Sequence, residues 1–147
     1  MELDEIKRKV NIALSQLKTN DADLFNFGIR TPERAVSHKL GCYLQPLFND
    51  LNVDCEYNRH IQNVKKNQEG NPIVPDIVIH HRKDDSNNLL VIEIKTNDDK
   101  EEIKKDINKL VLFTSKNGDF GYDYGLYMYF KAPEPSIISW FKDGHEI

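Results

Sequence analysis

The sequence predicts an α/β fold with a central mixed sheet flanked by helices and one extra helix at the N-terminus. Segments 73–82 and 89–96 are rich in β-branched apolar residues and are separated by a polar stretch, which predicts a β-hairpin. A helical pattern at 99–116 and an aromatic segment at 125–130 follow. Because a helix lies between them, the strand at 125–130 is expected to run parallel to the preceding strand.

The size and composition of the chain limit the classes of protein to which it can belong. Its 147 residues suit a single domain spanning 1–147, and 30% of them are charged, with a net charge of −4. This acidity argues against a surface covered in phosphate-binding charge, although a local basic patch can still bind nucleic acid. No apolar run is long enough for a membrane span and the first residues lack the pattern of a signal peptide, so we expect a cytoplasmic protein with no membrane partner.

Two helices are expected before the first strand. Apolar residues recur every three or four positions in 3–17, which predicts an amphipathic helix that covers the core or, alternatively, forms a dimer face. Thr31 as N-cap, followed by Pro32 at the first helical position, predicts a second helix that runs to about Leu44. Glu33, in the first turn of this helix, borders its buried side.

Three further segments surround the hairpin. Residues 53–61 are expected to form the first strand of the sheet, and the polar residues 64–71 are expected to form a loop. Residues 136–141 predict a last short strand or helix whose apolar side chains close the core.

The helix predicted at 99–116 has one apolar stripe. Its start resembles a capping box, with Asp98 three residues before Glu101. Gly118 is expected to end it in a left-handed conformation. The residues expected to face the core are Ile103, Ile107, Leu110, Val111 and Thr114, and those expected at the margins and outer face are Glu102, Lys105, Asp106 and Lys109.

Three charged residues interrupt the apolar segments of the hairpin. Asp76, Glu93 and Lys95 stand where the sequence otherwise has the composition of core strands, and an unpaired charge in a core is costly. Glu93 and Lys95 are two residues apart, so they lie on one face of their strand. If the hairpin is symmetric about Asp85 and Ser86, Asp76 lies opposite Lys95 and all three charges share one face.

Two carboxylates and a lysine on a common face suit divalent-metal chemistry. Mg²⁺ and Mn²⁺ prefer oxygen ligands, and Mg²⁺ takes only one or two carboxylates together with water and phosphate oxygens. A bound metal lowers the pKa of its water and polarises a phosphate, while a lysine orients the water or stabilises negative charge. Hydrolysis of phosphodiester bonds fits this set. The alternative is a surface hairpin in which Glu93 and Lys95 pair in solvent.

The same residues carry a family resemblance. Pro75 and Asp76, sixteen intervening residues and then Glu93-Ile94-Lys95 resemble the motif of the PD-(D/E)XK nuclease superfamily. The resemblance covers residues 31–130 and implies the αβββαβ core of the restriction-endonuclease-like fold. It implies that Asp76, Glu93, Lys95 and Glu33 are catalytic. It also implies a Mg²⁺ or Mn²⁺ ion held by Asp76, Glu93, Glu33 and the backbone carbonyl of Ile94.

Several of the candidate site residues have a second explanation. An acid in the first turn of a helix, as at Glu33, is also favoured by the helix dipole. Arg34, Lys65, Lys66 and Lys109 are candidates for contacts with nucleic acid, and each of them is alternatively a solvated side chain. By resemblance, Lys109 is also the residue that the helix after the motif would lend to the site.

The leading hypothesis is therefore a metal-dependent nuclease that hydrolyses phosphodiester bonds of nucleic acid, DNA in preference to RNA. The alternative is a catalytically inactive or partner-dependent module that binds nucleic acid or protein on the same fold. A third hypothesis is a purely structural protein whose hairpin charges are surface pairs. A chain of this size has little surface for sequence-specific readout, which favours a homodimer or a partner protein.

Overall fold

The computed structural model describes residues 1–26, 28, 30–60, 63–84 and 86–147. In chain order, the elements of these residues are α1 (Leu3–Asn20), η1 (Ala22–Phe25), α2 (Glu33–Leu44), η2 (Gln45–Leu47), β1 (Asn52–Cys55), β2 (Arg59–His60), β3 (Asn63–Val64), β4 (Ile77–His80), β5 (Leu90–Lys95), α3 (Lys100–Thr114), β6 (Tyr124–Phe130), β7 (Pro135–Lys142) and β8 (His145–Glu146), where η marks a 3₁₀ turn. Within the described residues, no helix combines the length and the apolar character needed to cross a membrane.

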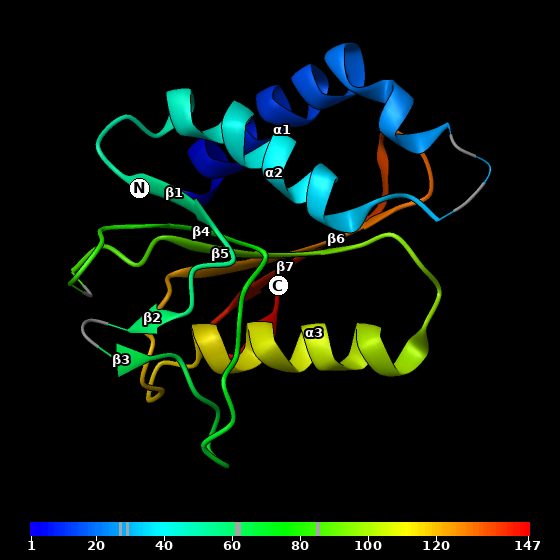
Figure 1. The fold of residues 1–147 in the computed structure, drawn as a ribbon. Helices are drawn as coiled ribbons and strands as arrows, with labels where there is room; N and C mark the ends of the chain where they lie inside the picture. The colour runs from blue at the N-terminus through cyan, green and yellow to red at the C-terminus, as the bar shows by residue number, and fades with distance from the viewer. Residues whose placement is uncertain (27, 29, 61–62, 85) are drawn as a thin grey trace.

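A mixed sheet lies between two layers of helix. Its strand order is β1-β4-β5-β6-β7-β8, in which β5 and β6 are parallel and the other neighbours are antiparallel. Figure 1 shows α1 and α2 on one face of the sheet and α3 on the other. The predicted α/β class, the helices flanking a mixed sheet and the parallel pairing across α3 are therefore confirmed.

The face under α1 and α2 holds the larger part of the core. Burial of α1 follows the predicted helical spacing, and its core residues are Ile6, Val10, Ala13, Leu14 and Leu17. They pack with Val36, Leu40 and Leu44 of α2 against side chains of β4 and β5 such as Ile79 and Ile92. Helix α1 therefore covers the core, which is one of the two roles predicted for it.

The face under α3 forms a second apolar layer. Val78 and Val91 of the hairpin pack there with Leu110 and Phe113 of α3. Gly125 on β6 allows the helix to approach closely, because a Cβ atom at this position would lie 3.1 Å from Cγ2 of Thr114 and 3.3 Å from Cδ2 of Leu110. This close packing brings the last turn of α3 against β6 beside Val91, near the start of β5.

The hairpin register differs from the predicted one by two residues. Ile77 pairs with Ile92 and Val78 with Val91, so Asp76 falls level with Glu93 instead of Lys95. Because side chains alternate with a period of two, a shift of two residues leaves every side chain on the predicted face. Asp85, one of the two residues on which the predicted turn was centred, lies outside the described residues.

Two predicted boundaries before the hairpin are wrong. The strand expected over 53–61 ends at Cys55, because Glu56 has a φ of 51° and leaves the extended conformation. The described part of its second half forms β2, which pairs with β3 in a separate small sheet, and residue 61 lies outside the described residues. Helix α2 begins at Glu33 after an extended Pro32, so Thr31 is not its N-cap.

Helix α3 is shorter at its C-terminus than the sequence predicts. Its N-cap is Asp99, whose side chain accepts hydrogen bonds from the backbone N–H groups of Glu101 and Glu102, so the capping box at Asp98 is also wrong. The helix ends at Thr114, and Gly118 does not adopt a left-handed conformation.

Candidate active site

The candidate site lies at the carboxyl end of β5. Glu93 and Lys95 are near the end of this strand and face α3, while Asp76 directly precedes β4. Glu33 is the first residue of α2, and Lys109 comes from α3. The structure therefore brings the motif residues together with an acid from α2 and a lysine from α3, which lie on opposite faces of the sheet (Figure 1).

Glu93 is the most deeply buried charged residue of the site. Its side chain is 0% exposed, and Oε2 lies 2.6 Å from Nζ of Lys109. Among the described residues, no group forms a hydrogen bond with its other carboxylate oxygen, Oε1. Burial, followed by the negative charge of Asp76, raises the pKa of Glu93 well above its ordinary value. A carboxylate here is costly unless a cation stays beside it.

Asp76 is held in place by the neighbouring strand. Its Oδ2 accepts a hydrogen bond of 2.7 Å from the backbone N–H of Ile94. Burial raises the pKa of Asp76 to about 6, and this hydrogen bond and the charge of Lys109 offset only part of the effect. The N–H of Ile94 thus orients Asp76, and the role of the Ile94 carbonyl as a ligand stays a prediction.

Lys95 lies between two acids from different helices. Its Nζ is 2.8 Å from Oδ2 of Asp106 and 3.5 Å from Oε1 of Glu33. Burial lowers the pKa of Lys95, but the adjacent carboxylate of Asp106, together with Glu33 and Asp76, outweighs this and the pKa is raised. The lysine is therefore a fixed positive charge in a residue that is only 5% exposed.

The end of β5 orients Glu33. Its Oε2 accepts a hydrogen bond from the backbone N–H of Thr96 at 3.1 Å and another from Oγ1 of Thr96 at 3.4 Å. Oγ1 of Thr96 also contacts the carbonyl of Thr31, at 3.0 Å. These bonds attach the start of α2 to the site and aim the Glu33 carboxylate at Lys95. The helix dipole also favours an acid at this position in the first turn of α2, and the catalytic role of Glu33 stays a prediction.

Asp106 is the site residue that the sequence analysis missed. The prediction placed it on the margin of α3, whereas it is 5% exposed and pairs with both Lys95 and, at 3.0 Å, Lys109. Its Oδ2 makes the ion pair with Lys95 without the geometry of a hydrogen bond. The signal was available, because Asp106 stands at helical spacing from two residues that are buried, Leu110 and Phe113.

The four residues predicted to contact nucleic acid lie in different environments. Arg34 is exposed and pairs with Glu56 at 2.9 Å, and Lys66 is exposed as well. Lys109 is part of the site, where it contacts Glu93 and the carbonyl of Val74. For Lys65 the prediction is wrong. Its buried ammonium group donates to the carbonyls of Tyr57 and Arg59.

The burial of the hairpin charges excludes one alternative. A solvent-facing pair of Glu93 and Lys95 requires both side chains to be exposed, and both are buried. The hypothesis of surface ion pairs is therefore wrong. Interior charges of this kind persist only when they are paired or serve a ligand.

The donor set suits Mg²⁺ better than zinc. Within the described ranges, no group of three or more His, Cys, Asp or Glu side chains is arranged to hold a metal ion. Mg²⁺ commonly uses only one or two protein carboxylates, with water and substrate oxygens completing its shell. Asp76 and Glu93 meet that requirement, and the unpaired Oε1 of Glu93 offers a buried oxygen ligand.

Comparison of the chain with protein-family models, with curated proteins and with solved structures gave no match.

Proposed function

We propose that this protein is a divalent-metal-dependent nuclease that hydrolyses phosphodiester bonds. One observation carries the proposal: Glu93 has a fully buried carboxylate oxygen without a hydrogen-bond partner in the described residues, beside a second acid, Asp76. Two adjacent acids in an apolar setting repel each other, and a divalent cation between them removes both the repulsion and the unpaired oxygen. The resemblance to PD-(D/E)XK nucleases implies DNA as substrate in preference to RNA.

The order of the elements supports a restriction-endonuclease-like fold. From the second helix onward the sheet elements and their helices follow as α2, β1, β4, β5, α3 and β6, which is an αβββαβ sequence once the small β2–β3 sheet is set aside. The Pro-Asp pair directly precedes β4, and the Glu-x-Lys residues end β5. Motif and order thus agree with each other.

Each residue of the site has a defined role in this proposal. Asp76, Glu93 and the carbonyl of Ile94 would hold Mg²⁺ or Mn²⁺, with Glu33 supporting the site. When bound, the metal supplies a polarised phosphate and a water of lowered pKa. Lys95 orients the attacking water or stabilises the negative charge that develops on the phosphate.

Asp106 acts as a positioning residue for the lysine. Its carboxylate lies 2.8 Å from Nζ of Lys95, and Glu33 lies on the other side at 3.5 Å. Two acids therefore fix the ammonium group, which has little freedom to leave the end of β5. A lysine fixed in this way needs no reorganisation when charge develops.

A second function is favoured by a different observation. The ion pairs Lys109–Glu93 and Lys95–Asp106 already neutralise most of the charge of the site, as a buried network without catalytic use would do. This favours the alternative of a module that binds nucleic acid or protein, or that needs a partner for turnover. Such a module requires no hydrolysis by the isolated chain.

Hydrolysis assays distinguish the two functions. Labelled single-stranded, duplex and branched DNA and RNA are incubated with the protein in Mg²⁺, in Mn²⁺ or in EDTA. The nuclease predicts cleavage in the presence of metal and none in EDTA. Intact substrates under every condition, together with binding of the same nucleic acids, would support the binding module.

A further inference from the structure

An open groove leads away from the candidate site on the α3 side of the sheet. It has a volume of about 500 Å³ and lies between α3 and the segment that precedes β4. Asp106 and Lys109 line it, and both also belong to the site. Lys109 additionally contacts the carbonyl of Val74, which ties the two walls of the groove together at this end. The groove is therefore continuous with the place where the phosphate would be cleaved.

The walls of the groove combine apolar surface with amide groups. Ile73 and Leu112 are partly buried apolar residues that line it, and Val74 is 38% exposed beside them. Two residues with side-chain amides, Asn67 of the segment before β4 and Asn108 of α3, line its opposite walls. The carbonyl oxygen of the Asn67 side chain accepts from the backbone N–H groups of residues 69 and 71, so its amide N–H₂ is the group left to face a ligand.

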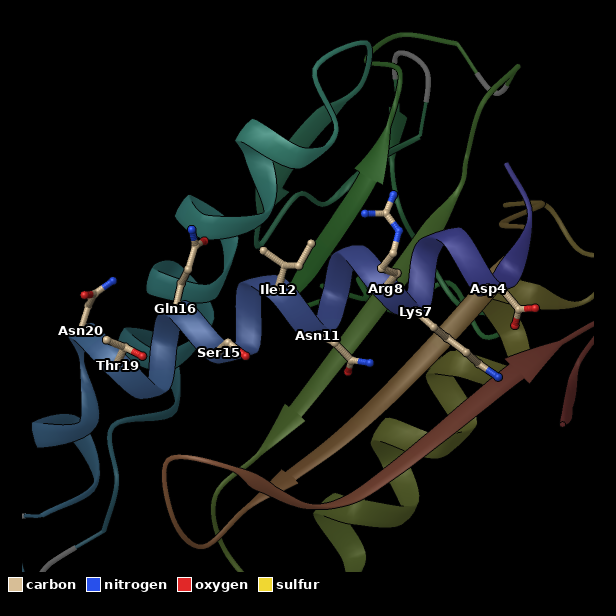
Figure 2. Close-up of a pocket in the computed structure, with 9 residues that line it drawn as sticks. All are labelled: Asp4, Lys7, Arg8, Asn11, Ile12, Ser15, Gln16, Thr19 and Asn20. Atoms are coloured by element: carbon tan, nitrogen blue, oxygen red, sulfur yellow. The ribbon is translucent and has the colours of Figure 1, made fainter.

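A second hollow has a different character. It lies along the outer face of α1, has a volume of about 670 Å³ and is lined only by residues of that helix, which Figure 2 shows projecting outward. It has no opposite wall, and α1 lies on the face of the sheet opposite to α3 (Figure 1). A residue of this hollow is therefore used as the control position in the test below.

We propose that the groove beside α3 binds an unpaired nucleobase of the substrate strand next to the scissile phosphate, so that the substrate is single-stranded. The inference rests on the proposed nuclease function. Ligand sites of this size are typically apolar with a few polar groups that fix orientation, and a base offers flat apolar faces with hydrogen-bonding edges. Ile73, Val74 and Leu112 suit the faces, and the amides of Asn67 and Asn108 suit the edges.

Base pairing in the substrate determines whether a base can enter the groove. In a duplex the base is stacked and paired, so moving it into the groove requires breaking its pairing and stacking, whereas a single strand avoids most of this cost. The lysines at the groove, Lys105 and Lys109, lie on the side of α3 where the backbone of such a strand would pass. A single-stranded substrate therefore fits both the groove and the candidate active site.

The test measures binding of short fluorescent oligonucleotides by anisotropy in Ca²⁺, which carboxylates also bind. The probes are a single strand, its duplex and an abasic strand of the same length. The variant is Asn108→Ala, because Asn108 is exposed on α3 and its truncation removes no core contact. The matched control is Asn11→Ala, an exposed asparagine on a helix, in the hollow of Figure 2.

The parent protein is expected to bind the single strand more tightly than the duplex or the abasic strand. Asn108→Ala is expected to weaken binding of the normal single strand about fivefold, the effect of one lost hydrogen bond, and to leave the abasic strand unchanged. Asn11→Ala should change neither. Equal or tighter binding of the duplex, or an equal effect of Asn108→Ala on normal and abasic strands, would overturn the groove assignment.

The outcomes separate this inference from the proposed function. Cleavage in Mg²⁺ without any dependence on bases or on Asn108 would remove the nucleobase groove and leave the nuclease. Base-dependent binding that needs Asn108, without cleavage in Mg²⁺ or Mn²⁺, would keep the groove as a binding site and remove the nuclease.

Discussion

Nζ of Lys109 lies 2.6 Å from Oε2 of Glu93, so an ammonium group from α3 neutralises the fully buried acid of β5. Burial alone would lower the pKa of Lys109, but Glu93 and Asp106 outweigh it and raise that pKa. The lysine therefore stays charged in a place where the proposed function requires a divalent cation nearby. Lys109 and the proposed cation would both neutralise the Glu93 carboxylate. Mutation of Lys109 separates their two contributions to the stability of the protein.

Replacing this lysine by methionine should change the response of the protein to metal. Lys109→Met leaves the Glu93 carboxyl without its partner and is expected to destabilise the metal-free protein by roughly 2–3 kcal/mol. Mg²⁺ or Mn²⁺ should then raise the melting temperature more in the variant than in the parent, because the cation replaces the lost charge. Differential scanning fluorimetry with a metal titration against EDTA measures this.

The control for this variant is Lys105→Met, which removes an exposed lysine that pairs with Glu102 on the same helix. It should leave both stability and metal response within the range of ordinary surface substitutions. Identical metal-induced shifts in the parent, Lys109→Met and Lys105→Met would speak against a cation at Glu93.

Replacing Asp106 is expected to lower the stability of the folded protein. Asp106→Asn removes the negative charge 2.8 Å from the buried Lys95, and Glu33 remains as its ion-pair partner among the described residues, at 3.5 Å. Losing one partner of a buried pair is expected to lower the free energy of unfolding by roughly 3 kcal/mol. Urea denaturation measures the loss, with the exposed Asp123→Asn as control. A loss no larger than that of the control would mean that Asp106 does not hold Lys95.

The raised pKa of Asp76 predicts a pH dependence of stability in the absence of metal. The unfolded chain releases this proton near the ordinary value of 3.8, and the folded chain retains it until about pH 6. Between these values the folded state binds more protons, so the free energy of unfolding falls as pH rises from about 4 to about 6.

The size of this effect is roughly 2–3 kcal/mol for Asp76, and the raised pKa of Glu93 acts in the same direction. Urea denaturation in EDTA across this pH range should show a shallower fall for Asp76→Asn than for the parent. Parallel pH profiles for the two proteins would show that Asp76 has an ordinary pKa in the folded state.

The grouping of the hairpin charges could be predicted from the sequence because it depends only on side-chain periodicity. Glu93 and Lys95 must share a face at a spacing of two, and Asp76 joins them for any register that is shifted by an even number of residues. The predicted register was wrong by two residues, but the three charges still lie on the same face of the hairpin. A shift of one residue would have separated Asp76 from the other two.

The partners of these charges could not be predicted in the same way. Lys65 is a polar residue in polar surroundings of the sequence, and only the path of the chain around Tyr57 buries it. For Asp106 the helical spacing indicates the burial, but it does not indicate which charges Asp106 pairs with. Burial of a charged side chain depends on contacts between distant segments, such as that between Lys95 and Asp106. Local periodicity carries little information about such contacts.

Cleavage by a variant of Asp76 tests the central claim most directly. The parent, Asp76→Asn and the exposed control Asp119→Asn are compared on labelled single-stranded DNA under single-turnover conditions in Mg²⁺ and in EDTA, with circular dichroism to verify folding. The parent and Asp119→Asn should cleave only in Mg²⁺, and Asp76→Asn should be slower by about 100-fold or more. A folded Asp76→Asn that cleaves as fast as the parent, or a parent that cleaves equally well in EDTA, would contradict a metal-dependent site at Asp76 and Glu93.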